Sequence, residues 1–231
     1  MSKEVIIMRP LPVINIKAQS SHHALFLMLV ALIITLCTLV FSQGYWRQFH
    51  LVIIFIYLCS LVIFITGLAK YLEPKYSLSL NPDGIKYQHR YGHWTVPWQQ
   101  IQRISLINET SGLATIQLPY IGIRLLNVST LADNISPRLA NRLIHEQKPL
   151  VAFAMSQNLL PLEQSLINFD PFVLASGEIL TGPLAAFLHH CTLLHQALGY
   201  HLFLPETALD RDLNEFCTLL TQCMRSSTKY N

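Results

Sequence analysis

The residues best suited to bind a metal gather on one predicted helix, residues 183–198, which carries His189, His190, Cys191 and His195. Cys191 and His195 are four residues apart, so both can face one ion. Zinc takes four nitrogen or sulfur ligands, and the remaining candidates lie elsewhere in the chain: His201, Cys217 and Cys223. No C-x-x-C or H-E-x-x-H pattern accompanies them. We therefore favour the simpler interpretation, in which Cys191 packs as a small apolar residue and the histidines face solvent or cap backbone groups.

Other residues capable of chemistry are isolated. Cys217 and Cys223 lie on different faces of one predicted helix and cannot form a disulfide with each other. His89 and His93 flank a predicted turn, where exposed histidines are a simpler interpretation than a pH-sensitive pair. The sequence contains no phosphate-binding loop, G-x-S-x-G motif or dinucleotide fingerprint. The sequence therefore predicts no catalytic, cofactor-binding or metal-binding residue, no cofactor and no enzyme activity.

The composition indicates that part of the chain does not face water. The 231 residues are 52% hydrophobic and only 13% charged, about half the charge of an ordinary soluble domain. The net charge of +3 hides a gradient, because residues 149–231 carry seven acidic and three basic side chains. Nucleic-acid binding would need Lys and Arg clustered on one element, and no such cluster exists. We expect no nucleic-acid partner.

Two uncharged apolar runs predict a transmembrane hairpin within residues 23–72. Residues 24–43 and 51–69 contain no Lys, Arg, Asp or Glu, and each spans about 30 Å as a helix, the thickness of a hydrocarbon core. Residues 44–50 form the predicted turn between them. A cleavable signal peptide is the first alternative, but the first run is too long and no A-x-A site follows it. A buried core helix rarely lacks charge for 19 residues twice in succession.

The charges beside the apolar runs predict the orientation. The N-terminal tail, residues 1–22, has three basic residues, and Lys70 and Lys75 follow the second run, whereas the turn has only Arg47. Basic flanks stay in the cytoplasm, so we expect both termini there. Neither run has an ionisable acid or base at its centre, which favours anchoring over transport.

After Glu73-Pro74 the pattern changes to alternating residues typical of strands. Turn signals such as Asn81-Pro82-Asp83-Gly84 separate six predicted strands. The strands are 76–80, 85–90, 93–98, 101–107, 113–118 and 123–128, with a break at Pro119 or Gly122. A helix from Pro137, capped by Ser136, closes the region.

A pattern of turn and core residues runs along this meander: Gly84, Ile85, Tyr87, Gly92, Val96, Pro97, Trp98, Ile101 and Ile104. In these residues the meander resembles that of bacterial membrane proteins with a pleckstrin-homology-like (PH-like) domain. The whole chain also resembles a bacterial protein family that is labelled only as a domain of unknown function. The resemblance implies a half-open antiparallel barrel capped by one helix, in a bacterial inner membrane. Lipid-binding pleckstrin domains place Lys or Arg around the first hairpin turn, but here that turn has Asp83 and no base. No phosphoinositide site is therefore expected.

The last part of the chain reads as helical. We expect a short helix at 149–160, an irregular connection at 161–177, the helix that ends before Gly199, and a last helix from Pro205 to about Met224.

Together these features predict an α+β membrane protein with four parts. They are an N-terminal tail (1–22), a two-helix transmembrane hairpin (23–72), an antiparallel PH-like β-barrel domain capped by a helix (73–148), and a C-terminal helical extension (149–231). We expect residues 73–231 to fold without the spans. The predicted function is a multi-pass, membrane-anchored cytoplasmic binding or scaffold protein that holds a protein partner or a second copy of itself. The alternative is a membrane-bound enzyme or metal-binding protein that uses the helical extension.

Overall fold

The computed structural model describes residues 13–17, 24–72, 76–111 and 114–230. The chain divides into two compact units. One comprises Ala18–Lys75, and the other combines Met1–Lys17 with Tyr76–Asn231. The second unit is therefore built from two stretches of chain that the first unit separates.

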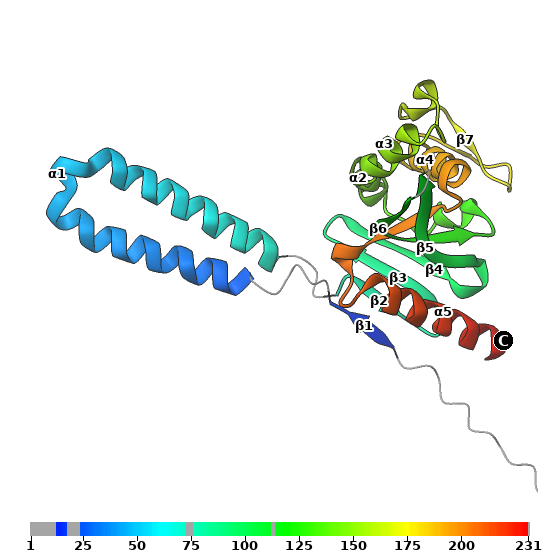
Figure 1. The fold of residues 1–231 in the computed structure, drawn as a ribbon, viewed down its shortest axis with the longest axis horizontal. Coiled ribbons are helices and arrows are strands. Elements are labelled where there is room, and N and C mark those ends of the chain that lie inside the picture. The colour runs from blue at the N-terminus through cyan, green and yellow to red at the C-terminus, as the bar shows by residue number, and fades with distance from the viewer. Residues whose placement is uncertain (1–12, 18–23, 73–75, 112–113, 231) are drawn as a thin grey trace, which may run out of the picture. The chain divides into compact units, whose positions relative to one another are not determined.

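The unit Ala18–Lys75 consists of one long apolar helix, α1 (Ala24–Tyr71), which is interrupted at Phe49. The backbone of Phe49 is not helical (φ −125°, ψ 24°), and the chain reverses there (Figure 1). The residues predicted as a turn, 44–50, are otherwise helical, so the turn is much shorter than predicted. The rings of Phe41 and Tyr45 stack one helical turn apart, with centroids 4.7 Å apart, just before the reversal.

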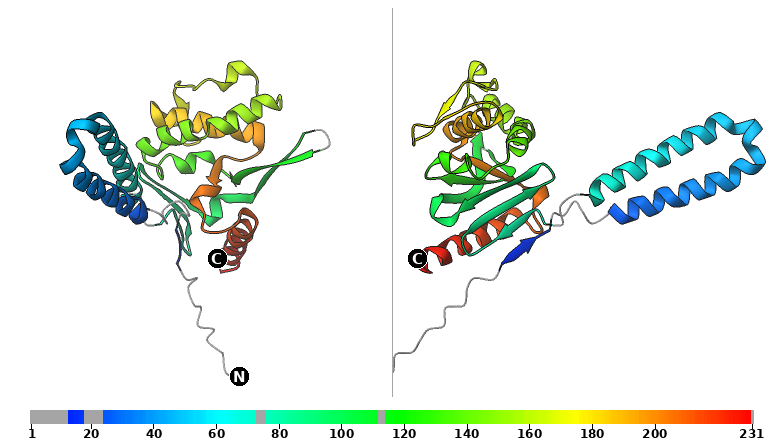
Figure 2. Two further views of the ribbon diagram at one scale, coloured as in Figure 1. Left: turned by 60° about the vertical axis from the view of Figure 1, so that its left-hand side comes forward. Right: turned by 180° about the vertical axis from the view of Figure 1, so that it is seen from behind.

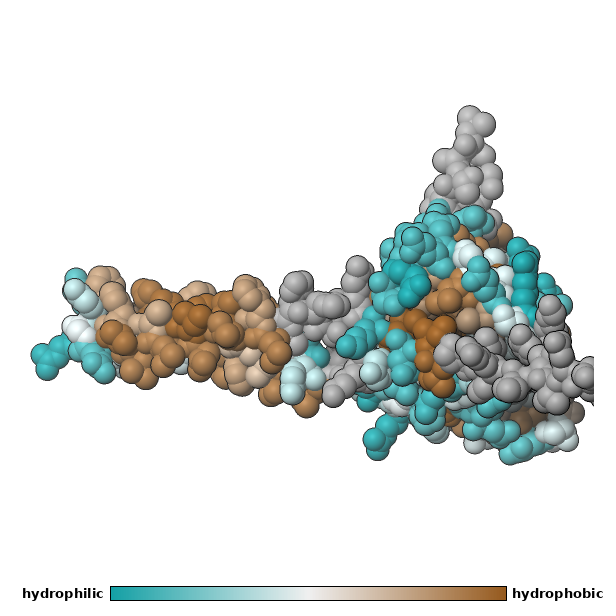
Figure 3. All heavy atoms as spheres, turned by 90° about the horizontal axis from the view of Figure 1, so that it is seen from below, coloured by the Kyte–Doolittle hydropathy of each residue, from teal (hydrophilic) through white to brown (hydrophobic). Residues whose placement is uncertain are grey.

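The two arms of α1 are held together by small and polar side chains. Ser60 Oγ donates to the carbonyl oxygen of Ala31 at 2.8 Å and lies 2.7 Å from Thr35 Oγ1. Ala31, Ser60 and Ile53 are almost fully buried between the arms. Close approach at small residues and satisfied hydroxyl groups are typical of helices that pack in an apolar medium. Figure 3 shows apolar side chains along α1 and hydrophilic ones near its reversal.

The larger unit contains two antiparallel sheets with helices around them (Figures 1 and 2). The first sheet has the order β1-β2-β3-β4 and the second β5-β6-β9, while β7 and β8 form a small hairpin. The strands are β1 (Ile14–Ile16), β2 (Leu78–Leu80), β3 (Gly84–His89), β4 (Gly92–Pro97), β5 (Ile101–Ser111), β6 (Ala114–Leu125), β7 (Phe172–Val173), β8 (Ile179–Leu180) and β9 (Leu202–Pro205). The helices are α2 (Pro137–Glu146), α3 (Lys148–Ser156), α4 (Pro183–Leu198) and α5 (Leu213–Tyr230). Short 3-10 turns are η2 (Trp98–Gln100), η3 (Val128–Leu131), η4 (Leu162–Ser165) and η5 (Glu206–Ala208).

The predicted antiparallel strands are present, but the described strands form a four-stranded sheet, a three-stranded sheet and the β7–β8 hairpin, and they do not close into a barrel. The 3-10 turn η2 separates β4 from β5, so these consecutive strands belong to different sheets. One apolar core nevertheless joins both sheets with α2, α4 and α5. Trp94 and Trp98 lie in this core, each 2% exposed, and Trp98 Nε1 donates to the carbonyl oxygen of Asn81 at 2.9 Å.

The N-terminal tail contributes a strand that the sequence did not indicate. Strand β1 pairs with β2, with Ile16 opposite Leu78, and the side chain of Ile16 is fully buried. The backbone nitrogen of Ser77 also donates to the carbonyl oxygen of Ile16 at 2.9 Å. Residues 18–75 are therefore inserted between two strands whose ends are adjacent.

The predicted break at Pro119 or Gly122 is also wrong, because β6 runs without interruption through both residues. Gly122 is opposite Ser105 on β5, and the aromatic ring of Tyr200 lies against it. A Cβ at position 122 would come within 2.4 Å of that ring. The hydroxyl groups of Tyr200 and Ser105 are hydrogen-bonded. Glycine here serves the close approach of an aromatic ring and not a turn.

The C-terminal part is not purely helical, contrary to the prediction. The segment at Pro205 is the end of strand β9, which pairs with residues Tyr120–Ile123 of β6, and α5 begins only at Leu213. The predicted helices at 137–147, 149–160 and 183–198 correspond to α2, α3 and α4. Ser136 caps α2 and Gly199 ends α4 in the left-handed conformation, as predicted. Residues 149–231 thus complete the second sheet as well as adding helices.

Candidate functional site

The histidines and the cysteine of α4 have different environments, because α4 packs against the core along one side. Cys191 and His190 are buried, whereas His189 is only partly buried. Burial raises the pKa of the Cys191 thiol far above its usual range. A thiol that stays protonated is neither a nucleophile nor a metal ligand. Cys191 therefore behaves as the small apolar residue that we expected.

His190 is hydrogen-bonded to a residue between α2 and α3. Its Nε2 lies 3.1 Å from Oε1 of Gln147, and both side chains are buried. Because an amide oxygen can only accept, Nε2 carries the hydrogen. Burial lowers the pKa of His190 to about 4, so the ring is neutral near pH 7. The pair joins α4 to the α2–α3 junction through an uncharged hydrogen bond.

His195 and His201 lie face to face, with ring centroids 4.0 Å apart. Nδ1 of His201 accepts a hydrogen bond from the backbone nitrogen of Leu125 at 3.1 Å. Burial, together with the nearby His195 and Arg124, lowers the pKa of His201 to about 4. Nδ1 of His195 is buried without a hydrogen-bond partner. The structure thus brings these two predicted zinc candidates together, but as stacked rings.

The full ligand set of the zinc hypothesis does not assemble among the described residues. No group of three or more His, Cys, Asp or Glu side chains within that part of the chain could hold a metal ion. Cys217 and Cys223 lie on α5, with the pKa of each raised by burial. His189 Nε2 lies 3.2 Å from the carbonyl oxygen of Asp170, and its ring meets that of Phe172 edge-on. His189 therefore holds the segment before β7 against α4.

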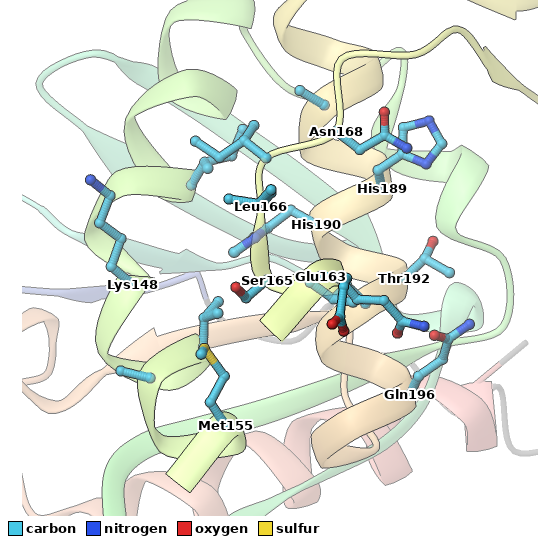
Figure 4. Close-up of a pocket in the computed structure, with 17 residues that line it drawn as sticks. Lys148, Met155, Glu163, Ser165, Leu166, Asn168, His189, His190, Thr192 and Gln196 are labelled. Carbon is cyan, nitrogen blue, oxygen red and sulfur yellow. The ribbon is translucent and has the colours of Figure 1, made fainter. Parts of the chain in front are cut away.

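An open cavity of about 780 Å³ lies between α3, α4 and the segment that contains η4 (Figure 4). In Figure 4, His190 projects from α4 toward the segment with Ser165 and Leu166, and all three residues line the cavity. Its lining is mixed: Ile144, Lys148, Val151, Ala152, Met155, Glu163, Gln164, Ser165, Leu166, Ile167, Asn168, Ala186, His189, His190, Thr192, Leu193 and Gln196. A mixed, concave and open surface of this size suits the binding of a ligand or peptide.

Sequence reasoning missed this cavity apart from its two histidines. The segment 161–177, read as an irregular connection, forms one wall of the cavity and exposes several large apolar side chains. Leu166 is 75% exposed and Leu162 is 67% exposed. A connection of this length without regular structure is itself a signal of function, because most connections in compact domains are much shorter.

The comparisons with known proteins address the family and leave the activity open. The model of a family described as a protein of unknown function, DUF2982, matches residues 78–226. The chain belongs to this family. The DUF2982 match covers both sheets except β1, all of the cavity-forming segments and most of α5. No curated protein and no solved structure matches the chain.

Proposed function

We propose that this DUF2982 protein is a membrane-anchored binding protein, in which α1 enters the bilayer and the larger unit binds a partner. By length and composition, α1 is the one helix among the described residues that could cross a membrane. Only 17% of its most apolar stretch is buried within the protein. Soluble proteins rarely expose so much contiguous apolar surface, so a lipid environment is its natural partner.

The interruption at Phe49 supports two crossings. Each arm has the length of a hydrocarbon core, and the polar atoms of Ser60 and Thr35 are satisfied between the arms. With basic residues concentrated outside the arms, both termini would lie in the cytoplasm. The resemblance to bacterial two-span proteins favours the inner membrane.

A PH-like relationship is part of the same proposal. The larger unit contains a four-stranded meander, a second three-stranded antiparallel sheet and a C-terminal helix, and the resemblance implies antiparallel strands capped by one helix. In this interpretation the capping helix is α5 and not α2, the helix from Pro137 that we predicted for this place, because α5 packs against β5, β6 and η2. Residues 126–201, which include α2, α3 and α4, are then an insertion between β6 and β9.

The observation that carries the binding role is the open cavity beside the exposed apolar residues Leu162 and Leu166. Exposed leucines next to a hollow with polar groups on its walls are typical of a protein-binding surface. The occupant we expect is a protein segment from a partner or from a second copy of this chain. No described residue favours the alternative of a membrane-bound enzyme, since Cys191 is buried as a protonated thiol and His190 is bonded to Gln147.

Photo-cross-linking in native membranes tests this role. A photoreactive amino acid at Leu166 should give a discrete cross-linked product, because this side chain lines the cavity and is also largely exposed. The same amino acid at Leu126, which is 61% exposed but does not line the cavity, is the matched control. Equal products from both positions, or none from position 166, would refute the binding role of the cavity.

A further inference from the structure

We propose that the turn between β3 and β4, together with the exposed face of α2, rests on anionic lipid headgroups of the membrane that α1 enters. The proposal rests on the membrane anchoring argued above and assigns the larger unit a second contact with the bilayer. The contact surface comprises Arg90 and Tyr91 of the turn with Arg138 and Arg142 of α2; we call it the basic turn surface.

An exposed tyrosine ring lies at the centre of this surface. The guanidinium carbon of Arg90 is 4.8 Å and that of Arg142 is 5.5 Å from the centre of the Tyr91 ring. Tyr91 is 37% exposed, and Arg90 and Arg142 are exposed as well. Arg138, also exposed, is one helical turn before Arg142 and therefore shares its face of α2. An aromatic ring among guanidinium groups suits the headgroup region, where a ring can bury one edge while cations meet phosphates.

The acidic residues of these segments only partly offset the charge. Glu146 Oε1 accepts a hydrogen bond from Arg142 Nε at 2.7 Å and lies 3.7 Å from His89 Nε2. Asp133 is exposed just before α2. The basic turn surface therefore has three arginines, Arg90, Arg138 and Arg142, and two acidic residues nearby. One of these acids, Glu146, is paired with Arg142.

The strand register places the basic turn surface at one particular end of the first sheet. At this end β1 ends and β2 begins, so the chain connects there to the apolar unit. Leu78 is opposite Tyr87, and the backbone nitrogen of Gln88 donates to the carbonyl oxygen of Ser77. Tyr76 is consequently level with His89, immediately before the turn. Figure 1 shows that β1 ends, β2 begins and β3 ends on the same side of the larger unit.

The connection to the apolar unit is short. Three residues separate Leu72 from Tyr76, and four Cα–Cα steps cover at most about 14 Å. The basic turn surface lies about one strand spacing and one or two residues from Tyr76, which adds roughly 10 Å. Once α1 is inserted, the turn is held within about 25 Å of the end of the helix by these lengths. Lys70, in the last turn of α1, and Lys75 of the connection add positive charge along the same stretch of chain.

A lipid surface is favoured over an acidic protein as the occupant because the tether keeps it permanently within reach. Each basic side chain near an anionic bilayer adds about fivefold to the local affinity. The attraction falls away within a Debye length, about 8 Å at physiological salt, so it acts only when the turn touches the headgroups.

Hydrogen exchange of the full-length protein in lipid nanodiscs tests the proposal. One preparation contains zwitterionic lipid only, and the other contains about one-third anionic phosphatidylglycerol, a proportion that gives a strong negative surface potential. We expect amides of residues 89–93 to exchange about threefold or more slowly in the anionic nanodiscs, since docking removes open states of the turn. Amides of β6 and β9, in the interior of the unit, should not change and serve as an internal standard.

The double substitution Arg90→Gln and Arg142→Gln should abolish the difference between the two lipids, as should high salt. Arg225→Gln is the control: it removes one positive charge from an exposed position near the C-terminal end of α5. Figure 1 shows this end of α5 on the side of the larger unit away from the start of β2. Its exchange should remain lipid-dependent. Equal exchange in both lipids, or loss of the difference in Arg225→Gln, would overturn the headgroup contact while leaving the anchoring intact. Failure of the wild-type protein to assemble with nanodiscs at all would overturn the anchoring, and the headgroup contact with it.

Discussion

Removing the side chain of Ile16 should strongly destabilise the larger unit, although this residue precedes the apolar unit in the chain. Ile16 is fully buried in the shared core, opposite Leu78 on β2. An isoleucine truncated to alanine in such a site costs about 2–5 kcal/mol, because transfer free energy is lost and a cavity remains. For a unit of this size, each kcal/mol lowers Tm by roughly 2–4 °C. We therefore expect Ile16→Ala to lower Tm by roughly 5–15 °C.

The assay uses a soluble protein in which residues 18–75 are replaced by a short Gly-rich linker. Such a linker can close the gap because the backbone nitrogen of Ser77 lies 2.9 Å from the carbonyl oxygen of Ile16. Thermal unfolding is followed by circular dichroism. Val13→Ala is the matched control, since Val13 is adjacent to β1 and 55% exposed, and it should change the free energy of unfolding by less than about 0.5 kcal/mol.

Two results would refute this reasoning. One is an equal shift of Tm in Ile16→Ala and Val13→Ala. The other is an unchanged Tm for residues 76–231 alone, which would show that β1 contributes nothing to the core. The second comparison also sharpens the expectation that residues 73–231 fold without the spans: that segment lacks β1 and should be less stable than the linked protein.

Further predictions use the same linked protein. Trp98→Ala should lower the free energy of unfolding by about 3–5 kcal/mol in a denaturant titration, because a buried ring and its hydrogen bond to Asn81 are lost; an unchanged midpoint would place Trp98 outside the core. Gly122→Ala should destabilise the unit by about 1–3 kcal/mol, since the new Cβ would overlap the ring of Tyr200, and a wild-type midpoint would contradict the close approach. Stability should fall as the pH drops from about 6.5 toward 4, because the unfolded chain binds a proton at His190 that the folded chain excludes. At pH 5 the contribution of His190 is about 2 kcal/mol. His201, whose pKa is also lowered to about 4, adds to the slope, so His190→Asn should make the pH profile shallower without flattening it; an equally steep profile in the variant would assign the effect to other groups.

The elements that could be predicted from the sequence are those whose signals are local. The N-cap Ser136, the C-terminal Gly199 and the turn 81–84 each act within a few residues, and the helices and the hairpin that they delimit are present. The apolar character of α1 follows from composition alone.

The missing features depend on partners distant in sequence. Strand β1 has only three residues, and its partner β2 lies some sixty residues later, so no periodicity could reveal it. Gly122 looked like a break because the ring of Tyr200, which requires the glycine, is 78 residues away. The cavity is equally nonlocal, since its walls come from α3, α4 and the segment with η4. Of the candidate residues, His189 and His190 were identified by type, but their hydrogen bonds to Asp170 and Gln147 depend on the fold.

The two segments for which we propose roles are both long insertions between strands that pair with each other. We call each insertion an excursion of the chain from its sheet. The apolar unit leaves the first sheet after Ile16 and returns at Ser77, and the cavity-bearing helices leave the second sheet after β6 and return at His201. Each excursion is closed by a backbone hydrogen bond between its ends: Ser77 to Ile16 at 2.9 Å, and His201 to Ile123 at 3.0 Å. Closure entropy grows only slowly with loop length, so a sheet can carry such excursions at little cost once their ends are paired. His201 strengthens the second closure, because its ring also accepts from the backbone nitrogen of Leu125. The two sheets and α5 therefore form a frame whose core α2 and α4 also share, and the anchoring and binding roles that we propose fall on the segments inserted into it.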